Sequence, residues 1–385
     1  MKKVVIIGAG ISGLFFANLL RQNSKYDITI YEKNSSINLE KGYGIQLSVN
    51  SVELLNKIGF KKLNSAIKFN PKKIDFYSLK NKKKICDLDI SAFNTDDAKY
   101  TTTQRSTLIE FLREKLPDNY IQFNKAIKKI EEEKEIIRLT MEDNLSLECD
   151  YLIISDGVFS STKLLLAKRN IKNEYFDSIA VRGTINKKNC NNINHSNISL
   201  LLGSNLHSVI YPVDKNNEFN FITILKKKLT NDMLKNYSLF NDDFFLQSIL
   251  KEISFQIEPN ILKNIENIKS FPIFTSNEIY KKKHKNIYLI GDAFFTFPPS
   301  FAQGAAQSIE AAYDLYKTFE NDGNNFLKKR LKKIKMIKRR SKFNNYAFHL
   351  SNPLMIFVRD ILMNYLVKNK NFLQRYLGKI YNREN

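Results

Sequence analysis

Residues 4–22 read VVIIGAGISGLFFANLLRQ, and residues 27–31 read DITIY. The short apolar run Val4–Ile7, which ends at Gly8, predicts a buried parallel strand, and the stretch 13–22 predicts a helix. Residues 27–31 predict a second strand. The N-terminus therefore predicts a strand, glycine turn, helix and strand that open an α/β domain. We interpret this segment as folded structure and not as a signal peptide.

The turn between the first strand and the helix is Gly8-Ala9-Gly10-Ile11-Ser12-Gly13, and Glu32 follows Gly13 by 19 residues. In this pattern the first glycine permits a tight turn, the second lets the backbone approach a pyrophosphate, and the third lets helix and strand pack closely. The helix N-terminus attracts phosphates, and an acid after the second strand can bind a ribose. The motif predicts a dinucleotide site and not a turn that binds nothing. The expected contacts are Gly8, Gly10, Ser12, Gly13, Glu32 and Lys33.

A second glycine turn lies far along the chain. The predicted strand 287–290 ends at Gly291-Asp292, and Pro298-Pro299 and AQGAAQ at 302–307 precede a predicted helix over 305–321. Two such turns suit a long dinucleotide that lies extended through the protein; the alternative is an ordinary turn with a proline stop. Asp292 could bind a ribityl hydroxyl, and the helix N-terminus would point at a flavin ring. The expected contacts are Gly291, Asp292, Pro299, Gln303, Gly304 and Ala305.

The rest of the chain contains segments typical of α/β structure and segments typical of antiparallel β structure. Helices are expected at 52–58 and 107–115, hairpins at 73–78 with 84–88 and at 136–141 with 146–149, and a strand at 151–154. Residues 178–225 contain four successive β runs and predict a mostly antiparallel sheet. A helix over 242–257 should end at Pro259. The basic C-terminal part predicts helices at 326–342, 353–367 and 372–381, the first with an apolar stripe of Phe326, Leu331, Ile334 and Ile337.

Three further stretches carry a family resemblance. They are GYGIQLSVN at 42–50, QRSTL at 104–108 and SDGVFSS at 155–161. Together with both glycine turns, and in consistent order over residues 1–350, they resemble the class A flavoprotein monooxygenases, the family of para-hydroxybenzoate hydroxylase. The salicylate hydroxylase-like branch is the most similar. The resemblance implies that FAD is also contacted by Gln46, Arg105, Asp156 and Gly157.

The resemblance implies a fold of the α/β plus antiparallel β class. A Rossmann-like, glutathione-reductase-like FAD-binding domain would comprise residues 1–72, 100–170 and 276–325. It would be interleaved with a mostly antiparallel-sheet substrate domain of residues 73–99 and 171–275. Residues 326–385 would form a C-terminal helical region.

Two smaller matches concern the substrate. Arg182-Gly183 resembles the branch's Arg-Gly strand, and His207 to Pro212 resembles its His-x-x-x-Tyr-Pro pattern. His207 and Tyr211 would share one face of a strand, where His207 could take a phenol proton and Tyr211 could orient the ring. The alternatives are a satisfied histidine on the sheet surface and a core tyrosine. Arg182 could bind substrate, gate the flavin or form a structural ion pair.

Four positions depart from the family pattern. Ala311 follows Glu310 where the family has a second acid, so that Glu310 stands alone; Ala302 precedes Gln303 where glycine is usual; Phe294 or Phe295 replaces a histidine; and Lys163 closes the Asp-Gly motif. These changes predict a more apolar pocket. They do not abolish FAD binding on physical grounds.

The implied activity is hydroxylation of a small aromatic or heteroaromatic compound through a flavin hydroperoxide. NADH or NADPH would dock transiently to reduce FAD, and O₂ would supply the oxygen. One alternative is a ring hydroxylase of the ubiquinone pathway at the membrane surface. Another is a flavin-binding redox protein without turnover. The chain has no Trp, which argues against flavin halogenases.

The amino-acid composition limits the classes of molecule that the protein is expected to bind. The 385 residues include 61 Lys and Arg against 39 Asp and Glu, a net charge of +22. No nucleic-acid-binding module accompanies this charge, which leaves a Lys-coated surface, an anionic membrane or an anionic substrate open. The scattered cysteines Cys86, Cys149 and Cys190 and four unclustered histidines predict a cytoplasmic protein without disulfides or a metal site. The protein would be a monomer or a homodimer.

Overall fold

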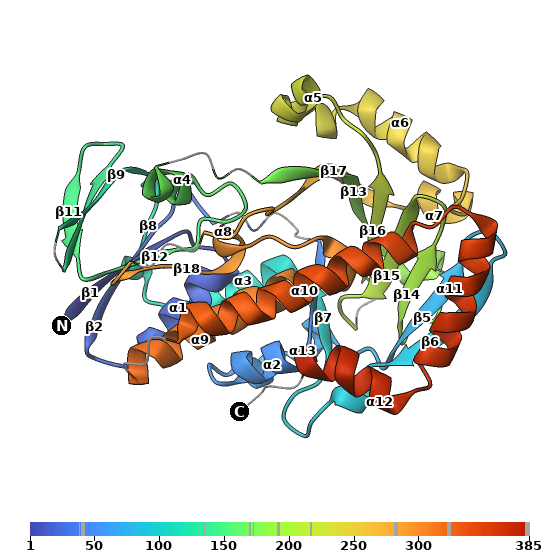
Figure 1. Ribbon diagram of the computed structural model, residues 1–385, viewed down its shortest axis with the longest axis horizontal. Coiled ribbons are helices and arrows are strands. Elements are labelled where there is room, and N and C mark those ends of the chain that lie inside the picture. The colour runs from blue at the N-terminus through green and yellow to red at the C-terminus, as the bar shows by residue number, and fades with distance from the viewer. Residues whose placement is uncertain are drawn as a thin grey trace.

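The computed structural model describes residues 1–37, 39, 43–133, 135–168, 171, 173–190, 193–215, 218–280, 284–321 and 325–381. Two sheets lie side by side, and two long helices, α9 (Gly304–Asn321) and α10 (Phe326–Phe348), run along them (Figure 1). The predicted combination of α/β and antiparallel β structure is confirmed. The ranges named above include residues outside this description, namely 38, 40–42, 134, 169–170, 172, 191–192, 216–217, 281–283, 322–324 and 382–385.

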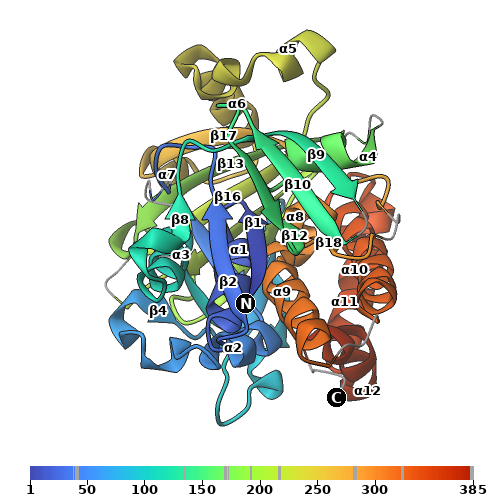
Figure 2. The same cartoon turned by 90° about the vertical axis from the view of Figure 1, so that its left-hand side faces the viewer.

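The first sheet is parallel throughout and carries the N-terminal unit. Its order is β18 (Ile287–Leu289), β12 (Tyr151–Ile154), β1 (Lys2–Ile7), β2 (Tyr26–Tyr31) and β8 (Ile121–Gln122). Helix α1 (Ile11–Leu20) connects β1 to β2, as predicted, but it begins two residues before Gly13 because Gly10 already serves as its N-cap. Figure 2 shows α1 and α9 beside this sheet.

The second sheet has seven strands. Its order is β17 (Glu266–Thr275), β13 (Glu174–Asn186), β16 (Glu218–Lys226), β15 (Leu206–Pro212), β14 (Ile198–Leu202), β5 (Lys73–Ser78) and β6 (Lys83–Asp89). All neighbours are antiparallel except β14 and β5. The predicted hairpin of β5 and β6 thus joins a sheet whose other strands come a hundred residues later. The domain limits given above stay a prediction.

Two three-stranded sheets and several helices complete the fold. The small sheets are β3 (Gly44–Leu47), β7 (Thr101–Gln104) and β4 (Lys68–Phe69), and β11 (Ser146–Cys149), β10 (Ile136–Met141) and β9 (Ile127–Glu133). The other helices before α9 are α2 (Val49–Asn56), α3 (Arg105–Glu114), α4 (Ser161–Ala167), α5 (Asn231–Lys235), α6 (Asp243–Ser254), α7 (Pro259–Lys263) and α8 (Gly291–Phe294). The role predicted for Pro259 was wrong: α6 ends earlier, and Pro259 opens α7, where a missing N–H costs nothing.

The C-terminal region folds back onto the second sheet. Helix α11 (Pro353–Leu366) contacts β6, and α12 (Lys370–Leu373) and α13 (Lys379–Tyr381) flank a π-helical turn at Gln374–Gly378. Within the described part of the chain, no helix is both long and apolar enough to cross a membrane.

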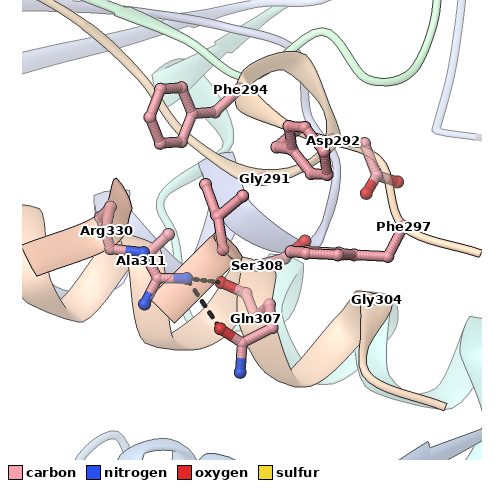
Figure 3. A pocket seen from close by; sticks show the side chains of 11 residues that line it. Gly291, Asp292, Phe294, Phe297, Gly304, Gln307, Ser308, Ala311 and Arg330 are labelled. Atoms are coloured by element: carbon pink, nitrogen blue, oxygen red, sulfur yellow. Dashed lines mark hydrogen bonds between the residues drawn. The ribbon is translucent and has the colours of Figure 1, made fainter. Parts of the chain in front are cut away.

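A buried ion cluster joins α9 to α10. Arg330 is 2% exposed, and its Nη1 donates to Glu310 Oε1 at 3.0 Å and to Asp314 Oδ2 at 3.1 Å. Its Nη2 donates to Gln307 Oε1 at 2.8 Å (Figure 3). The expectation that Glu310 stands alone was wrong, because Asp314 supplies a second acid one helical turn further on. The amide of Asn50 also donates to Glu310.

Replacing Arg330 with Met should remove the buried cation that Glu310 and Asp314 share. The two carboxylates would keep the contacts with Lys333 at 3.4 Å and with Lys329 at 2.8 Å, whose side chains are more exposed than that of Arg330. We expect Arg330→Met to lower the free energy of unfolding by about 3–5 kcal/mol, measured by urea unfolding followed by circular dichroism. Lys61→Met is the control, because Lys61 and its partner Asp97 are both exposed and an exposed pair contributes little. Equal, small effects of the two substitutions would show that the cluster carries no net stability.

Candidate active site

The two glycine turns meet in space. Strands β1, β12 and β18 are parallel neighbours, so their carboxyl ends lie at one edge of the sheet. At this edge a Cβ on Gly291 would stand 2.5 Å from Ser12 Oγ. The predicted convergence of turns almost 280 residues apart in the sequence is therefore present in the structure.

Gly8 and Gly13 are required by the fold itself. Gly8 has a φ of +100°, and a Cβ there would stand 2.7 Å from the carbonyl oxygen of Ser155. A Cβ on Gly13 would stand 2.2 Å from the carbonyl oxygen of Gly8. These approaches are shorter than any non-bonded carbon contact, so both positions exclude a side chain for the packing reasons expected of the motif.

Other glycines face open space. A Cβ on Gly10, Gly157 or Gly304 would meet no atom within 4 Å. Two buried polar atoms, Asp156 Oδ1 and Gln303 Nε2, have no hydrogen-bond partner among the described residues. At these glycines a ligand can approach the main chain without meeting a side chain, and the two unpaired polar atoms can form hydrogen bonds with it. Both features fit an extended polar ligand.

The acid after the second strand holds the first turn in place. Glu32 Oε2 accepts a hydrogen bond from the Ala9 N–H at 2.9 Å, and its Oε1 accepts from the Asn34 N–H at 3.0 Å. Lys33 beside it is exposed. The carboxylate is therefore oriented at the edge of the turn, where the motif expects it to meet a ribose.

Three charged side chains act on one another where the turns approach the second sheet. Burial raises the pKa of Asp292 to about 6, and the Arg105 guanidinium opposes that rise. Burial and the charge of Arg182 lower the pKa of Arg105. Burial also lowers the pKa of Arg182, whose guanidinium carbon lies 5.7 Å from the ring centre of Tyr43. Two cations against one carboxylate give this region a positive potential.

A cavity of about 420 Å³ opens between the second turn, the second sheet and the C-terminal helices. His207, Tyr211 and Arg182, which the sequence predicted as substrate residues, all line it. His207 and Tyr211 both project from β15, as their spacing required. The predicted cofactor residues on the cavity wall are Gln46, Asp292, Pro299, Gln303, Gly304 and Ala305.

His207 has a partner that the sequence did not reveal. Its Nδ1 lies 2.7 Å from Nε2 of His349, the residue that follows α10, and both side chains are buried. Burial and the neighbouring His349 hold the pKa of His207 well below its usual value. Burial and Lys226 lower the pKa of His349 to about 4. Both rings are therefore neutral at pH 7.

Tyr211 belongs to a chain of polar side chains. The Gln46 amide bonds to the Tyr211 hydroxyl and accepts from the Tyr100 hydroxyl at 2.9 Å. Tyr381 of α13 bonds to Tyr100 in turn. Burial raises the pKa of Tyr211 beyond its usual range, although Arg182 and Gln46 oppose that rise. Tyr211 is thus a neutral hydroxyl in a fixed orientation.

Sequence reasoning missed the wall built by the C-terminal helices. Phe343, Ala347 and Met363 line the cavity from α10 and α11. The i, i+4 spacing of Phe343 and Ala347 was the available signal, but both residues lie beyond Lys342, where the predicted helix ended.

The expectation that Phe294 and Phe295 make the pocket apolar was also wrong. Both pack in the core beneath the turn, beside a gap of about 10 Å³ next to Arg330 (Figure 3). The apolar lining of the large cavity comes from other side chains, which include Phe297 and Phe301.

Comparison with known families identifies the fold and its ligand. Residues 1–321 match the family described as FAD binding domain, so the chain belongs to this family, whose cofactor is FAD. The chain is 22% identical to 6-hydroxynicotinate 3-monooxygenase of Bordetella bronchiseptica over 386 residues, which cover 96% of this chain and 98% of the relative. It is 21% identical to salicylate hydroxylase of Pseudomonas putida, with 81% and 75% of the two chains covered.

Solved structures agree with this assignment. HpxO of Klebsiella pneumoniae, in complex with FAD and uric acid, superposes with a TM-score of 0.79 at 15% identity over 99% of this chain and 96% of that one. A salicylate hydroxylase substrate complex superposes with a TM-score of 0.78 at 17% identity over 100% and 96%. The resemblance to class A flavoprotein monooxygenases is confirmed.

Gly10 offers a clean test of FAD contact because its backbone is extended, with φ −90° and ψ −175°. Gly10→Val should leave the melting temperature of the FAD-free protein unchanged, since the new side chain enters open space. FAD affinity, measured by fluorescence titration, should fall about tenfold or more because that space is the expected pyrophosphate position. Gly13→Val, in contrast, should prevent stable folding. Undiminished FAD affinity in Gly10→Val would place the cofactor elsewhere.

The buried histidine pair makes stability depend on pH. An unfolded histidine binds a proton near pH 6.5, whereas the folded pair stays neutral to lower pH, so the unfolded state gains protons first. We expect the free energy of unfolding to fall by about 2 kcal/mol between pH 7 and pH 5 through His349 alone. His349→Gln should remove this part of the slope in urea unfolding. An unaltered slope would mean that the pKa of His349 is the same in the folded and the unfolded protein.

Proposed function

We propose that the protein is an FAD-dependent, NAD(P)H-consuming monooxygenase that hydroxylates a small aromatic or heteroaromatic compound. The observation that carries this proposal is the shared cavity, which joins the second flavin turn to a wall with His207, Tyr211 and Arg182. An FAD-binding fold alone would not require such a cavity next to the turn. The relatives named above act on 6-hydroxynicotinate and salicylate, which are small aromatic acids.

The described residues suit FAD in detail. Gly10, Gly157 and the Asp156 carboxylate would hold the phosphates and ribose, while Gln303 and Gly304 would face the flavin ring. When bound and reduced by NAD(P)H, FAD supplies the activation of O₂ that transfers one oxygen atom to an aromatic ring. The N-terminus of α9 and the two guanidinium groups favour negative charge at this end of the cofactor.

His207 is our candidate for the base that removes a proton from a ring hydroxyl. The 2.7 Å contact between the two rings allows two tautomers, and the one that suits a base has His207 Nδ1 donating to His349 Nε2. In that tautomer His207 Nε2 carries a lone pair and can accept the substrate proton. His349 is a positioning residue, because it fixes the tautomer and the orientation of the His207 ring.

Tyr211 and Arg182 would bind the substrate. The Tyr211 hydroxyl, held by Gln46, can donate to a ring oxygen or a carboxylate. Arg182 brings a partly buried cation to the cavity wall and favours an anionic ring compound. The apolar remainder of the wall excludes water from the reacting atoms.

A ring compound with an apolar tail is the second candidate substrate. The observation in its favour is the apolar wall from α10 and α11, which includes Phe348 and Met363. Such a compound corresponds to the ring hydroxylase at a membrane surface that the sequence left open.

The activity test is NAD(P)H oxidation and O₂ uptake with a panel of 6-hydroxynicotinate, salicylate, urate and alkylated phenols. We expect one class to accelerate oxidation and to give a hydroxylated product. His207→Gln should lower kcat/KM about 10²–10⁴-fold while FAD stays bound. Since burial holds the pKa of His207 well below 6.5, wild-type kcat/KM should stay level from pH 8 to below pH 6.5.

His195→Gln, in the loop before β14, is the matched control and should turn over normally. Unchanged turnover and pH profile in His207→Gln would remove His207 from proton transfer. A protein that binds FAD but gives no aromatic-dependent oxidation would instead support the redox protein without turnover.

A further inference from the structure

Helix α11 turns its charged side chains toward the protein and exposes its apolar side chains to solvent. Its two charged residues face the protein: Arg359 is 7% exposed, and it pairs with Asp360 at 2.7 Å and donates to the Ala347 carbonyl. Its solvent side is apolar instead. The exposed large side chains are Leu354 (69%), Met355 (42%), Phe357 (63%), Val358 (42%), Ile361 (53%), Leu362 (52%) and Tyr365 (68%), which we call the α11 face.

This arrangement is the reverse of an ordinary surface helix, which buries its apolar stripe and exposes its charges. No charged side chain of α11 is exposed. A continuous row of large apolar side chains on one helix marks a surface that is covered in use. Figure 1 shows α11 at the outer edge of the molecule, beside the second sheet.

The surroundings of the α11 face are strongly basic. Residues 326–381 contain 15 Lys and Arg and a single acid, Asp360. Exposed cations precede and follow the helix, with Lys342 before it and Lys368, Lys370 and Arg375 after it. An apolar strip between cations is complementary to a surface that is apolar inside and anionic at its boundary.

We propose that the α11 face binds the surface of an anionic phospholipid bilayer. The 14 residues of α11 span about 21 Å, which is less than the roughly 30 Å of a hydrocarbon core, so the helix would lie along the surface. A second copy of the chain fits less well, because a twofold contact would place the same basic residues against each other. This proposal does not depend on the reaction assigned above.

The other side of α11 gives the contact a consequence. Met363, Leu366 and Val367 line the 420 Å³ cavity, so one helix separates the cavity from the proposed lipid surface. An aromatic compound dissolved in the bilayer would therefore reach the cavity over a short path. The cavity wall and the α11 face are opposite sides of one short helix, and they can be altered independently.

Vesicle co-sedimentation of the FAD-loaded full chain tests the proposal. We expect binding to vesicles of phosphatidylcholine with phosphatidylglycerol, and weak binding to phosphatidylcholine alone. The double substitution Phe357→Ser with Ile361→Ser should lower the partition coefficient about tenfold or more. The control is Phe244→Ser with Phe255→Ser, which removes two aromatic side chains that are 84% and 81% exposed at the ends of α6. It should bind like the wild type.

Retained FAD absorbance and melting temperature show that both double variants are folded. Equal binding by the two double variants, or equal binding of the wild type to both kinds of vesicle, would overturn the proposal. So would a wild-type dimer in light scattering that Phe357→Ser with Ile361→Ser dissociates without lipid binding, because the α11 face would then be a contact between two copies. Salt that abolishes the preference for anionic vesicles would support the role of the basic flanks.

Discussion

The close approach of backbone at the carboxyl ends of three parallel strands governs the rest of the structure. Gly13 lies against Gly8, and Gly8 lies against Ser155, at distances that no side chain could share. Because β18 follows β12 in the same sheet, the second turn reaches the same edge and meets Ser12 at Gly291. One extended cofactor can therefore reach residues from three distant parts of the chain, around Gly8–Gly13, Ser155 and Gly291.

That edge also determines where chemistry can occur. The chain leaves β18, passes the prolines at 298–299 and enters α9, whose N-terminus faces the cavity under the second sheet. The buried cluster around Arg330 joins α9 to α10, and the residue directly after α10 is His349, which contacts His207. Helix α9, whose N-terminus faces the cavity, is thus connected to the proposed base His207 through α10 and His349. This connection explains why a helical region outside the FAD-binding family match contributes to the cavity.

Local patterns explain what the sequence could predict. The glycine turn, Glu32 and the β5–β6 hairpin depend on neighbours within about 30 residues, so spacing and alternation reveal them. The i, i+4 relation of His207 and Tyr211 likewise follows from strand geometry alone. The partners of these residues come from far along the chain. His349 lies 142 residues from His207, and the second acid at Asp314 becomes relevant only because Arg330 packs against it. The orientation of α11 also depends on packing, since its two charged residues, Arg359 and Asp360, are adjacent in the middle of an apolar segment and the sequence alone does not say which side faces the protein.

The most direct measurement is the origin of the oxygen in the product. FAD-loaded protein, NAD(P)H and the aromatic compound that is turned over would be incubated under ¹⁸O₂, and the product would be examined by mass spectrometry. A monooxygenase with the flavin facing the cavity should insert one ¹⁸O atom per product molecule, with the second atom reduced to water. Product that takes its oxygen from solvent, or NAD(P)H oxidation that yields only hydrogen peroxide with every aromatic tested, would contradict the account.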